Sequence, residues 1–265
     1  GACSMSISKV IHYCWFGGNE MPAAYKKYME SWKRYCPDYE IKLWNEQNFD
    51  FSDNLYARQA YEQKKWAFVS DYARLKIIYE FGGIYLDTDV EIIRPLDDLL
   101  ELKGFLGFQD NKEIATGLGF GAEKGNPVIK AMLADYADAA FILPDGTHDA
   151  TPCPKRNTEA LIPLGFRADG CMQTVDGVTL FPADYFCPIG FHDSRKNFSA
   201  NTYSIHHYAA SWHSAKDRIN TNVRRRAQIL LGNGPVYSKL FLPAYYRVLH
   251  FFGNVIRLCK KILHK

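Results

Sequence analysis

FGGIYLDTDVEII, residues 81–93, sets two carboxylates, Asp87 and Asp89, one residue apart at the end of an apolar run. The run predicts a buried strand, and ligands of open α/β sheets bind beyond the carboxyl ends of the strands. Residues i and i+2 of a strand share a face, so the two carboxylates are expected to converge. Neighbouring carboxylates repel unless a cation neutralises them, and oxygen ligands suit Mg²⁺ or Mn²⁺. A solvated strand end carries the same pattern, so both interpretations stay open here.

Strand and helix patterns alternate on the amino-terminal side of this stretch. They predict strands within residues 9–18 and 39–45, and helices from Pro22, over 53–64 and over 66–81. Alternation of this kind favours an α/β fold around a largely parallel central sheet.

Beyond residue 100 the patterns are shorter. The sequence predicts strands at 104–110 and 116–123, a helix at 126–141, and one more strand within 202–212. Residues 141–200 are rich in Pro, Gly and Asp without a clear period, so we expect a long loop-rich region of the kind that carries binding residues.

The predicted helix before the DTD stretch carries a second polar group. In SDYARL, residues 70–75, Ser70, Asp71 and Arg74 lie on adjacent helical turns. An arginine near clustered acids forms a structural salt bridge in one interpretation. In the other, Asp71 accepts hydrogen bonds from ligand hydroxyls and Arg74 holds a phosphate.

Three segments in the same order resemble glycosyltransferase family 32, the sugar-transferring DXD proteins. They are IHYCWFGG from residue 11, the stretch from WAFVSDYARL to YLDTDVEI, and HHYAASW from residue 206. This family includes relatives of yeast-type initiating mannosyltransferases and of bacterial capsule transferases, and the layout remotely resembles the glucosylating domain of large clostridial toxins. The resemblance covers residues 7–213. It implies a single GT-A (Rossmann-like) domain over residues 5–213, a nucleotide-sugar donor, Mn²⁺ or Mg²⁺, and retention of anomeric configuration.

The resemblance assigns roles to residues of the first two segments. Trp15 matches the aromatic residue that stacks on the nucleobase, although a core tryptophan after the first strand would look the same. Asp71 and Arg74 match groups that hold the donor sugar and its phosphates. Asp87 matches the acid that touches ribose and sugar hydroxyls, and Asp89 matches the direct metal ligand.

The third segment is expected to supply the rest of the site. His207 fits the place of a further metal ligand, and Trp212 resembles the residue that donates its indole N–H to the leaving β-phosphate. On a strand, His206 would point to the opposite face, so we expect it to be a packed histidine. Ala210 departs from the toxin-like pattern, in which a hydroxyl assists the metal.

Two further segments lie outside these motifs. TGLGFG, residues 116–121, has the glycine spacing of a phosphate loop, but no helix follows at once, so we expect tight packing near the sugar pocket. Asn157, Thr158 and Glu159 are candidates for acceptor selection.

The substrates are expectations of the resemblance. A UDP-hexose is favoured as donor, galactose or N-acetylglucosamine first, with GDP-mannose open. The acceptor is expected to be a saccharide, lipid-linked in capsule or surface polysaccharide synthesis. Three alternatives are an effector that glycosylates a protein, a non-catalytic nucleotide-sugar-binding protein, and a phosphohydrolase that uses YLDTDVE. The last is disfavoured because its motif normally stands near the start of the chain.

Charge is unevenly distributed along the chain. Residues 214–265 hold eleven of the 32 Lys and Arg and one of the 29 acids, a net charge of +10, whereas residues 1–213 carry −7. Apolar residues at helical spacing from Tyr245 to Leu263 predict an amphipathic basic helix in this segment. It either packs on its own domain or lies on an anionic membrane. Nucleic acid is not expected as a partner, because no recognised binding module accompanies the charge.

The number and spacing of the cysteines indicate the redox environment of the chain. The seven cysteines form no CxxC pair, so we expect reduced thiols and neither a disulfide framework nor a zinc site. No signal peptide pattern is present, and the expected location is cytoplasmic, peripheral on the inner face of the cell membrane.

Overall fold

The computed structural model describes residues 6–190, 196–208, 223, 227 and 236–248. The chain divides into two compact units, one of residues 1–190 with 196–212 and one of 191–195 with 213–265. Every residue of the candidate site described below belongs to the first unit. Within the described residues, no helix is long and apolar enough to cross a membrane.

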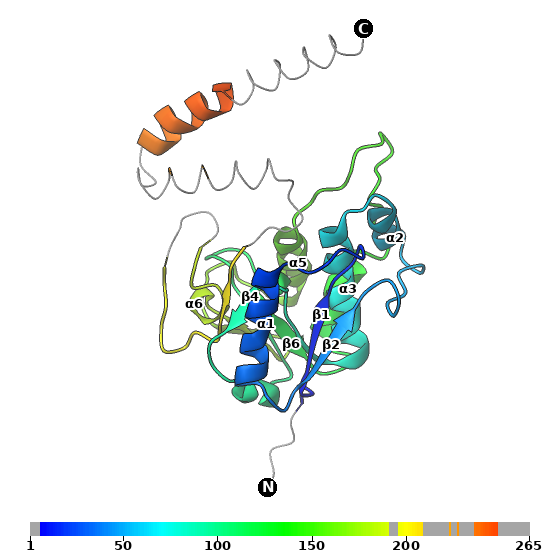
Figure 1. Ribbon diagram of the computed structural model, residues 1–265, viewed down its shortest axis with the longest axis vertical. Helices are drawn as coiled ribbons and strands as arrows, with labels where there is room; N and C mark the ends of the chain where they lie inside the picture. Colours follow the sequence, from blue (N-terminus) through cyan, green and yellow to red (C-terminus); the bar gives the residue numbers. More distant parts are fainter. Residues whose placement is uncertain (1–5, 191–195, 209–222, 224–226, 228–235, 249–265) are drawn as a thin grey trace. The chain divides into compact units, whose positions relative to one another are not determined.

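A seven-stranded mixed sheet forms the centre of the first unit (Figure 1). The order is β2-β1-β3-β6-β5-β8-β7, with bounds β1 Val10–Cys14, β2 Glu40–Trp44, β3 Gly83–Tyr85, β5 Gly104–Gly107, β6 Phe120–Ala122, β7 Gln173–Val175 and β8 Val178–Phe181. Three neighbouring pairs are parallel: β1 with β2, β1 with β3, and β5 with β8. The other three are antiparallel. The expected α/β class is confirmed, but the expectation of a largely parallel sheet is wrong, because β6 enters antiparallel between β3 and β5.

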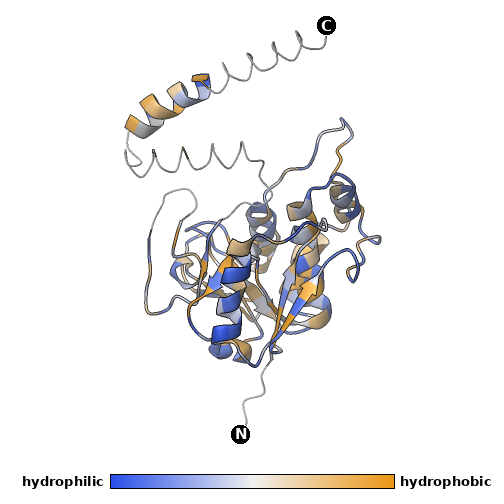
Figure 2. Ribbon diagram, viewed as in Figure 1, coloured by the Kyte–Doolittle hydropathy of each residue, from blue (hydrophilic) through white to orange (hydrophobic). Residues whose placement is uncertain are grey.

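Helices surround this sheet. They are α1 Ala23–Tyr35, α2 Leu55–Glu62, α3 Trp66–Phe81, α4 Pro127–Ala134, α5 Cys153–Leu161 and α6 Ala183–Phe186, with short helical turns η1 Asp97–Glu101, η2 Thr116–Leu118 and η3 Ile162–Leu164. α5, the β7–β8 hairpin and α6 all lie in the region expected to be loops, where Pro and Gly between short elements hide their periodicity. Hydrophobic residues line the inner strands (Figure 2).

The helix α3 is buried on most sides. It contacts α2, α4 and β1, and Asp71 and Arg74 are buried along with apolar residues such as Leu75 and Ile78. The sequence suggested that one apolar face of this helix is buried, but more of its circumference is buried in the structure. Gly82 ends the helix at a φ of 70°, and a Cβ there would stand 2.9 Å from the backbone N of Lys124. The turn from α3 into β3 thus requires glycine.

A small second sheet flanks the main one. β4, Val90–Ile92, pairs antiparallel with β9, Ser204–His206, and α1 packs against β4. The predicted single strand over residues 84–93 is therefore two strands, β3 and β4, separated by a turn.

The second unit is described only in part. Residues 236–248 are helical, including η4 Val236–Phe241, and Val236, Leu240, Tyr246 and Val248 are exposed. Most of the predicted amphipathic basic helix, residues 249–265, lies outside the described residues.

Candidate active site

Asp87 and Asp89 occupy the turn between β3 and β4. The backbone N–H of Val90 donates to the carbonyl of Asp87 at 3.0 Å, which closes the turn. The two carboxylates therefore converge through a tight turn and not through the shared face of one strand. The position at the carboxyl end of β3 is the predicted one.

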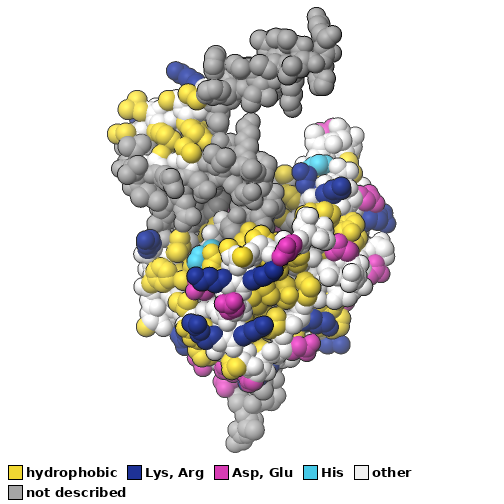
Figure 3. Space-filling model, viewed as in Figure 1, with side chains coloured by type: hydrophobic (Ala, Val, Ile, Leu, Met, Phe, Trp, Pro, Cys, Tyr) yellow, Lys and Arg dark blue, Asp and Glu magenta, His cyan; other side chains and the backbone are white. Residues whose placement is uncertain are grey.

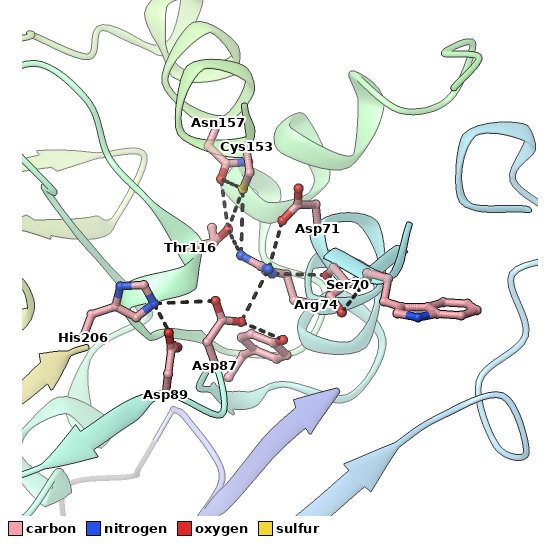
Figure 4. Close-up of polar contacts among 11 residues, drawn as sticks. Ser70, Asp71, Arg74, Asp87, Asp89, Thr116, Cys153, Asn157 and His206 are labelled. Atoms are coloured by element: carbon pink, nitrogen blue, oxygen red, sulfur yellow. Dashed lines mark hydrogen bonds and ion pairs between the residues drawn. The ribbon is translucent and has the colours of Figure 1, made fainter. Parts of the chain in front are cut away.

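The register of the small sheet brings a histidine to this turn. Val90 of β4 pairs with His206 of β9, and the His207 N–H donates to the Asp89 carbonyl at 3.0 Å. As a result the His206 ring lies over the DTD turn (Figure 4). Its Nε2 is 3.1 Å from Asp89 Oδ1 and 3.9 Å from Asp87 Oδ2.

Asp87, Asp89 and His206 form a group able to hold a metal ion. Each offers one ligand atom, and these atoms lie within 4.8 Å of one another. Burial raises the pKa of Asp87, as does the charge of Asp89, while Arg74 opposes both. Burial alone would lower the pKa of His206, but the two carboxylates raise it above its usual value. Carboxylate oxygens and an imidazole nitrogen are a donor set that fits Mn²⁺ or Mg²⁺.

Arg74 lies buried between two acids. Its Nη2 is 2.9 Å from Asp71 Oδ1 and 3.4 Å from Asp87 Oδ1, and its Nε donates to the Ser70 carbonyl at 3.1 Å. The pKa of Asp71 is raised to about 6 by burial, which the charge of Arg74 opposes. The pKa of Arg74 stays well above its ordinary value, because the carboxylates outweigh burial. The salt bridge that the sequence left as one interpretation is thus present.

The turn η2 closes over these charges. A Cβ on Gly117 would stand 2.7 Å from Asp87 Oδ2 and 3.3 Å from Arg74 Nη1, so only glycine allows this approach. The Arg74 Nη1 donates to Thr116 Oγ1 at 3.4 Å. This agrees with the tight packing expected of the TGLGFG segment.

The helix α5 adds two polar side chains one turn apart. Asn157 Oδ1 accepts from Thr116 Oγ1 at 3.0 Å and from Cys153 Sγ at 2.9 Å. Burial raises the pKa of Cys153 to about 12, so the thiol keeps the proton that it donates. Asn157 Nδ2 is buried and has no hydrogen-bond partner among the described residues. A buried amide donor without a partner is costly, so Asn157 Nδ2 is a candidate donor to a ligand oxygen.

Family comparison gives this arrangement a context. Residues 22–106, which include α3 and the DTD turn, match the model described as a glycosyltransferase sugar-binding region containing a DXD motif. This part of the chain therefore resembles the DXD glycosyltransferase family. The family resemblance seen in the sequence is therefore confirmed.

Individual relatives match part of the chain. Inositol phosphoceramide mannosyltransferase 3 of Schizosaccharomyces pombe is 30% identical over 142 residues, 52% of this chain and 39% of that protein. Lactosylceramide 4-alpha-galactosyltransferase of Mus musculus is 31% identical over 148 residues, 54% of this chain and 38% of that protein. The chain thus spans less than half the length of these curated relatives. Among solved structures, the PaToxG glycosyltransferase gives a TM-score of 0.44 at 20% identity, over 59% of this chain and 69% of that one.

Two of the predicted site residues, His207 and Trp15, contact groups other than the carboxylates of the DTD turn. His207 Nε2 is 2.8 Å from Glu91 Oε2, and its ring stacks on Tyr28 with centroids 4.2 Å apart. His206 and not His207 therefore faces the carboxylates, a correction to the predicted ligand. Trp15 follows β1, the parallel neighbour of β3, and its Nε1 donates to the Asn19 carbonyl at 2.7 Å.

Two of the predicted positions, Ala210 and Trp212, lie outside the described residues. The sequence predicts no role for Cys153, predicts only tight packing near the sugar pocket for the segment that begins at Thr116, and predicts acceptor selection for Asn157. No spacing pattern links α5 to the DTD turn, so only the glycines of TGLGFG pointed to this part of the site.

Proposed function

We propose that the chain is a metal-dependent hexosyltransferase with a GT-A fold, which moves a sugar from a nucleotide diphosphate to a saccharide acceptor. The observation that carries this proposal is the convergence of the DTD turn, His206 and Arg74 in one partly buried cluster, whose DTD turn and Arg74 lie in the region that matches the DXD glycosyltransferase model. Two carboxylates, Asp71 and Asp87, pair with the Arg74 guanidinium there, and Asp89 lies 3.1 Å from His206 Nε2, so three carboxylates meet one guanidinium and one imidazole. Their excess negative charge suits a divalent cation.

Asp89 and His206, with Asp87 beside them, are the residues that would hold Mn²⁺ or Mg²⁺. A bound divalent cation supplies positive charge at the departing diphosphate. His206 takes the role that the sequence gave to His207. Its Nε2 faces Asp89, which leaves the buried Nδ1, without a partner among the described residues, to carry the ring proton.

The chain's own residues bind and orient the donor. Arg74 keeps its charge and its planar donors near the two carboxylates, where it favours developing negative charge on phosphate. Asp71 and Asp87 accept hydrogen bonds from sugar and ribose hydroxyls, and Asn157 Nδ2 donates to a sugar oxygen. Trp15 stacks on the nucleobase, and Trp212 donates to the β-phosphate. We propose retention of configuration by attack on the face that the diphosphate leaves, which needs no protein nucleophile.

The acceptor is proposed to be a lipid-linked glycan. Two relatives have ceramide-based acceptors in their names, inositol phosphoceramide and lactosylceramide, which supports a lipid-linked acceptor here. The names of these two relatives specify different sugars, mannose and galactose, so they do not indicate which sugar this chain transfers. We retain a UDP-hexose as the favoured donor. Capsule or surface polysaccharide synthesis at the inner face of the membrane is the proposed setting.

A donor panel tests the function. The purified chain is mixed with UDP-glucose, UDP-galactose, UDP-N-acetylglucosamine and GDP-mannose, with and without Mn²⁺, and released nucleoside diphosphate is measured. We expect release from one donor, lost with EDTA and reduced at least 100-fold in Asp89→Ala, about the loss seen when one transition-state stabilising group is removed. If no donor releases nucleoside diphosphate while the chain still binds nucleotide without metal, a non-catalytic binding protein is favoured.

A further inference from the structure

The outer face of α1 is strongly basic. Its exposed side chains include four cations and a single acid, Lys26, Lys27, Lys33, Arg34 and Glu30. At 3.6 residues per turn these five positions fall within about a third of the helix circumference. Figure 3 shows Lys and Arg side chains gathered on the face over α1. Because residues 1–213 carry a net charge of −7, this face has the opposite sign to the segment that contains it.

Helix stability does not account for Lys26 and Lys27, whereas Lys33 and Arg34 lie in the last turn of α1, where cations favour the helix dipole. Cations near a helix N-terminus oppose the helix dipole, yet Lys26 lies in the first turn of α1 with Lys27 directly after it and no acid in that turn. Lys26 pairs with Glu20 at 3.1 Å. No carboxylate within the described parts of the chain lies within 4.0 Å of the Lys27, Lys33 or Arg34 nitrogens. Three cations therefore face outward without partners there.

The inner face of α1 is hydrogen-bonded to β4, the strand that follows the DTD turn. Trp32 Nε1 donates to the Val90 carbonyl at 2.8 Å, and the Ile92 N–H donates to Ser31 Oγ at 2.9 Å. Val90 follows Asp89 in the chain. Since a helix with its side chains is about 10 Å across, the basic face lies about one helix diameter from the strand that begins at the DTD turn.

We propose that the outer face of α1 contacts an anionic lipid surface and thereby holds the active site beside a membrane. This deepens the proposed function, since it rests on the lipid-linked acceptor. The cations are spread along the helix and do not converge on a point, which suits the delocalised charge of a lipid surface better than one phosphate group. Each Lys or Arg near such a surface strengthens binding by about fivefold.

Vesicle binding by the full chain tests the proposal. The probes are vesicles of phosphatidylcholine alone and of phosphatidylcholine with phosphatidylglycerol, read by co-sedimentation. The variant is K26Q/K27Q/K33Q/R34Q, and the matched control removes four exposed lysines elsewhere, K103Q/K112Q/K124Q/K130Q. We expect binding to anionic vesicles to weaken by about 100-fold in the α1 variant, from three unpaired charges, and by less than about fivefold in the control. Circular dichroism melts confirm that both variants fold.

The outcome of the vesicle experiment can be distinguished from that of the donor panel, because nucleoside diphosphate release is measured without a membrane. Equal vesicle binding by the two variants overturns the assignment to α1, even if nucleoside diphosphate release continues. Selective loss in the α1 variant, with wild-type protein silent on every donor, supports the membrane contact while the transferase proposal fails. Equal binding of wild-type protein to both vesicle types overturns the electrostatic contact.

Discussion

A buried histidine beneath the active site predicts how stability depends on pH. His12 lies on β1 and is 2% exposed. Its Nδ1 accepts from Trp44 Nε1 at 3.0 Å, so its Nε2 carries the proton that it donates to the Gly82 carbonyl at 2.9 Å. A second proton on Nδ1 would break the bond from Trp44. Burial lowers the pKa of His12 from 6.5 to about 4, although the bond to Gly82 partly opposes this.

The sign and size of the effect follow from this pKa. Between pH 6.5 and about 4 the unfolded chain binds a proton at His12 and the folded chain does not, so stability is lost as pH falls through that window. The loss from His12 between pH 7 and pH 5 is about 2 kcal/mol, and it approaches about 3 kcal/mol at pH 4. Above pH 7 the folded state has no such disadvantage.

Urea unfolding followed by tryptophan fluorescence at pH 7 and pH 5 measures this loss. Carboxylates also titrate on acidification, so the quantity of interest is the difference between wild type and His12→Gln, which has no proton to gain. We expect the variant to lose about 2 kcal/mol less than wild type over this interval. Equal losses in the two proteins would refute the assignment of a neutral buried His12.

Two further perturbations test the site itself. His206→Ala is expected to raise the Mn²⁺ concentration that gives half-maximal release of nucleoside diphosphate by at least 10-fold, which is typical when a group that supports a metal site is removed. His207→Ala is expected to change this concentration by less than about threefold. If His207→Ala raised this Mn²⁺ concentration more than His206→Ala did, His207 would be the ligand instead. Gly117→Ala places a Cβ 2.7 Å from Asp87 Oδ2, so the carboxylate must shift by several tenths of an ångström. We expect a loss in kcat/KM of up to about 100-fold with an unchanged melting temperature, and unchanged kinetics would contradict the close approach.

The proximity of Asp71, Arg74 and Asp87 was predictable because these residues are close along the chain. α3 and β3 are joined by a glycine turn, so Asp71, Arg74 and Asp87 reach one another over short distances. The α/β class was also predictable, since apolar periodicity is local. The inserted antiparallel strand β6 was not, because strand direction depends on pairing between distant segments.

The choice between the two histidines shows where sequence reasoning stops. Alternation correctly required His206 and His207 to point to opposite sides of their strand. Which side faces the carboxylates depends on the β4–β9 register, in which His206 opposes Val90. A shift of one residue would exchange the two rings. The sequence holds no local signal for that register, and the same is true of Asn157, which reaches the site from a helix with no patterned link to the DTD turn.

Charge balance explains why the proposed ligands belong together. In the cluster, Asp71 and Asp87 pair with the guanidinium of Arg74, and Asp89 lies beside His206 Nε2. Burial raises the pKa of Asp71 to about 6 and raises that of Asp87. Raised carboxyl pKa values mean that the protein alone stabilises these negative charges poorly. A divalent cation at the DTD turn would lower that cost, and it would in turn favour a diphosphate beside Arg74. On the proposed function, cation and donor therefore bind cooperatively, because each removes a charge imbalance that the other would create.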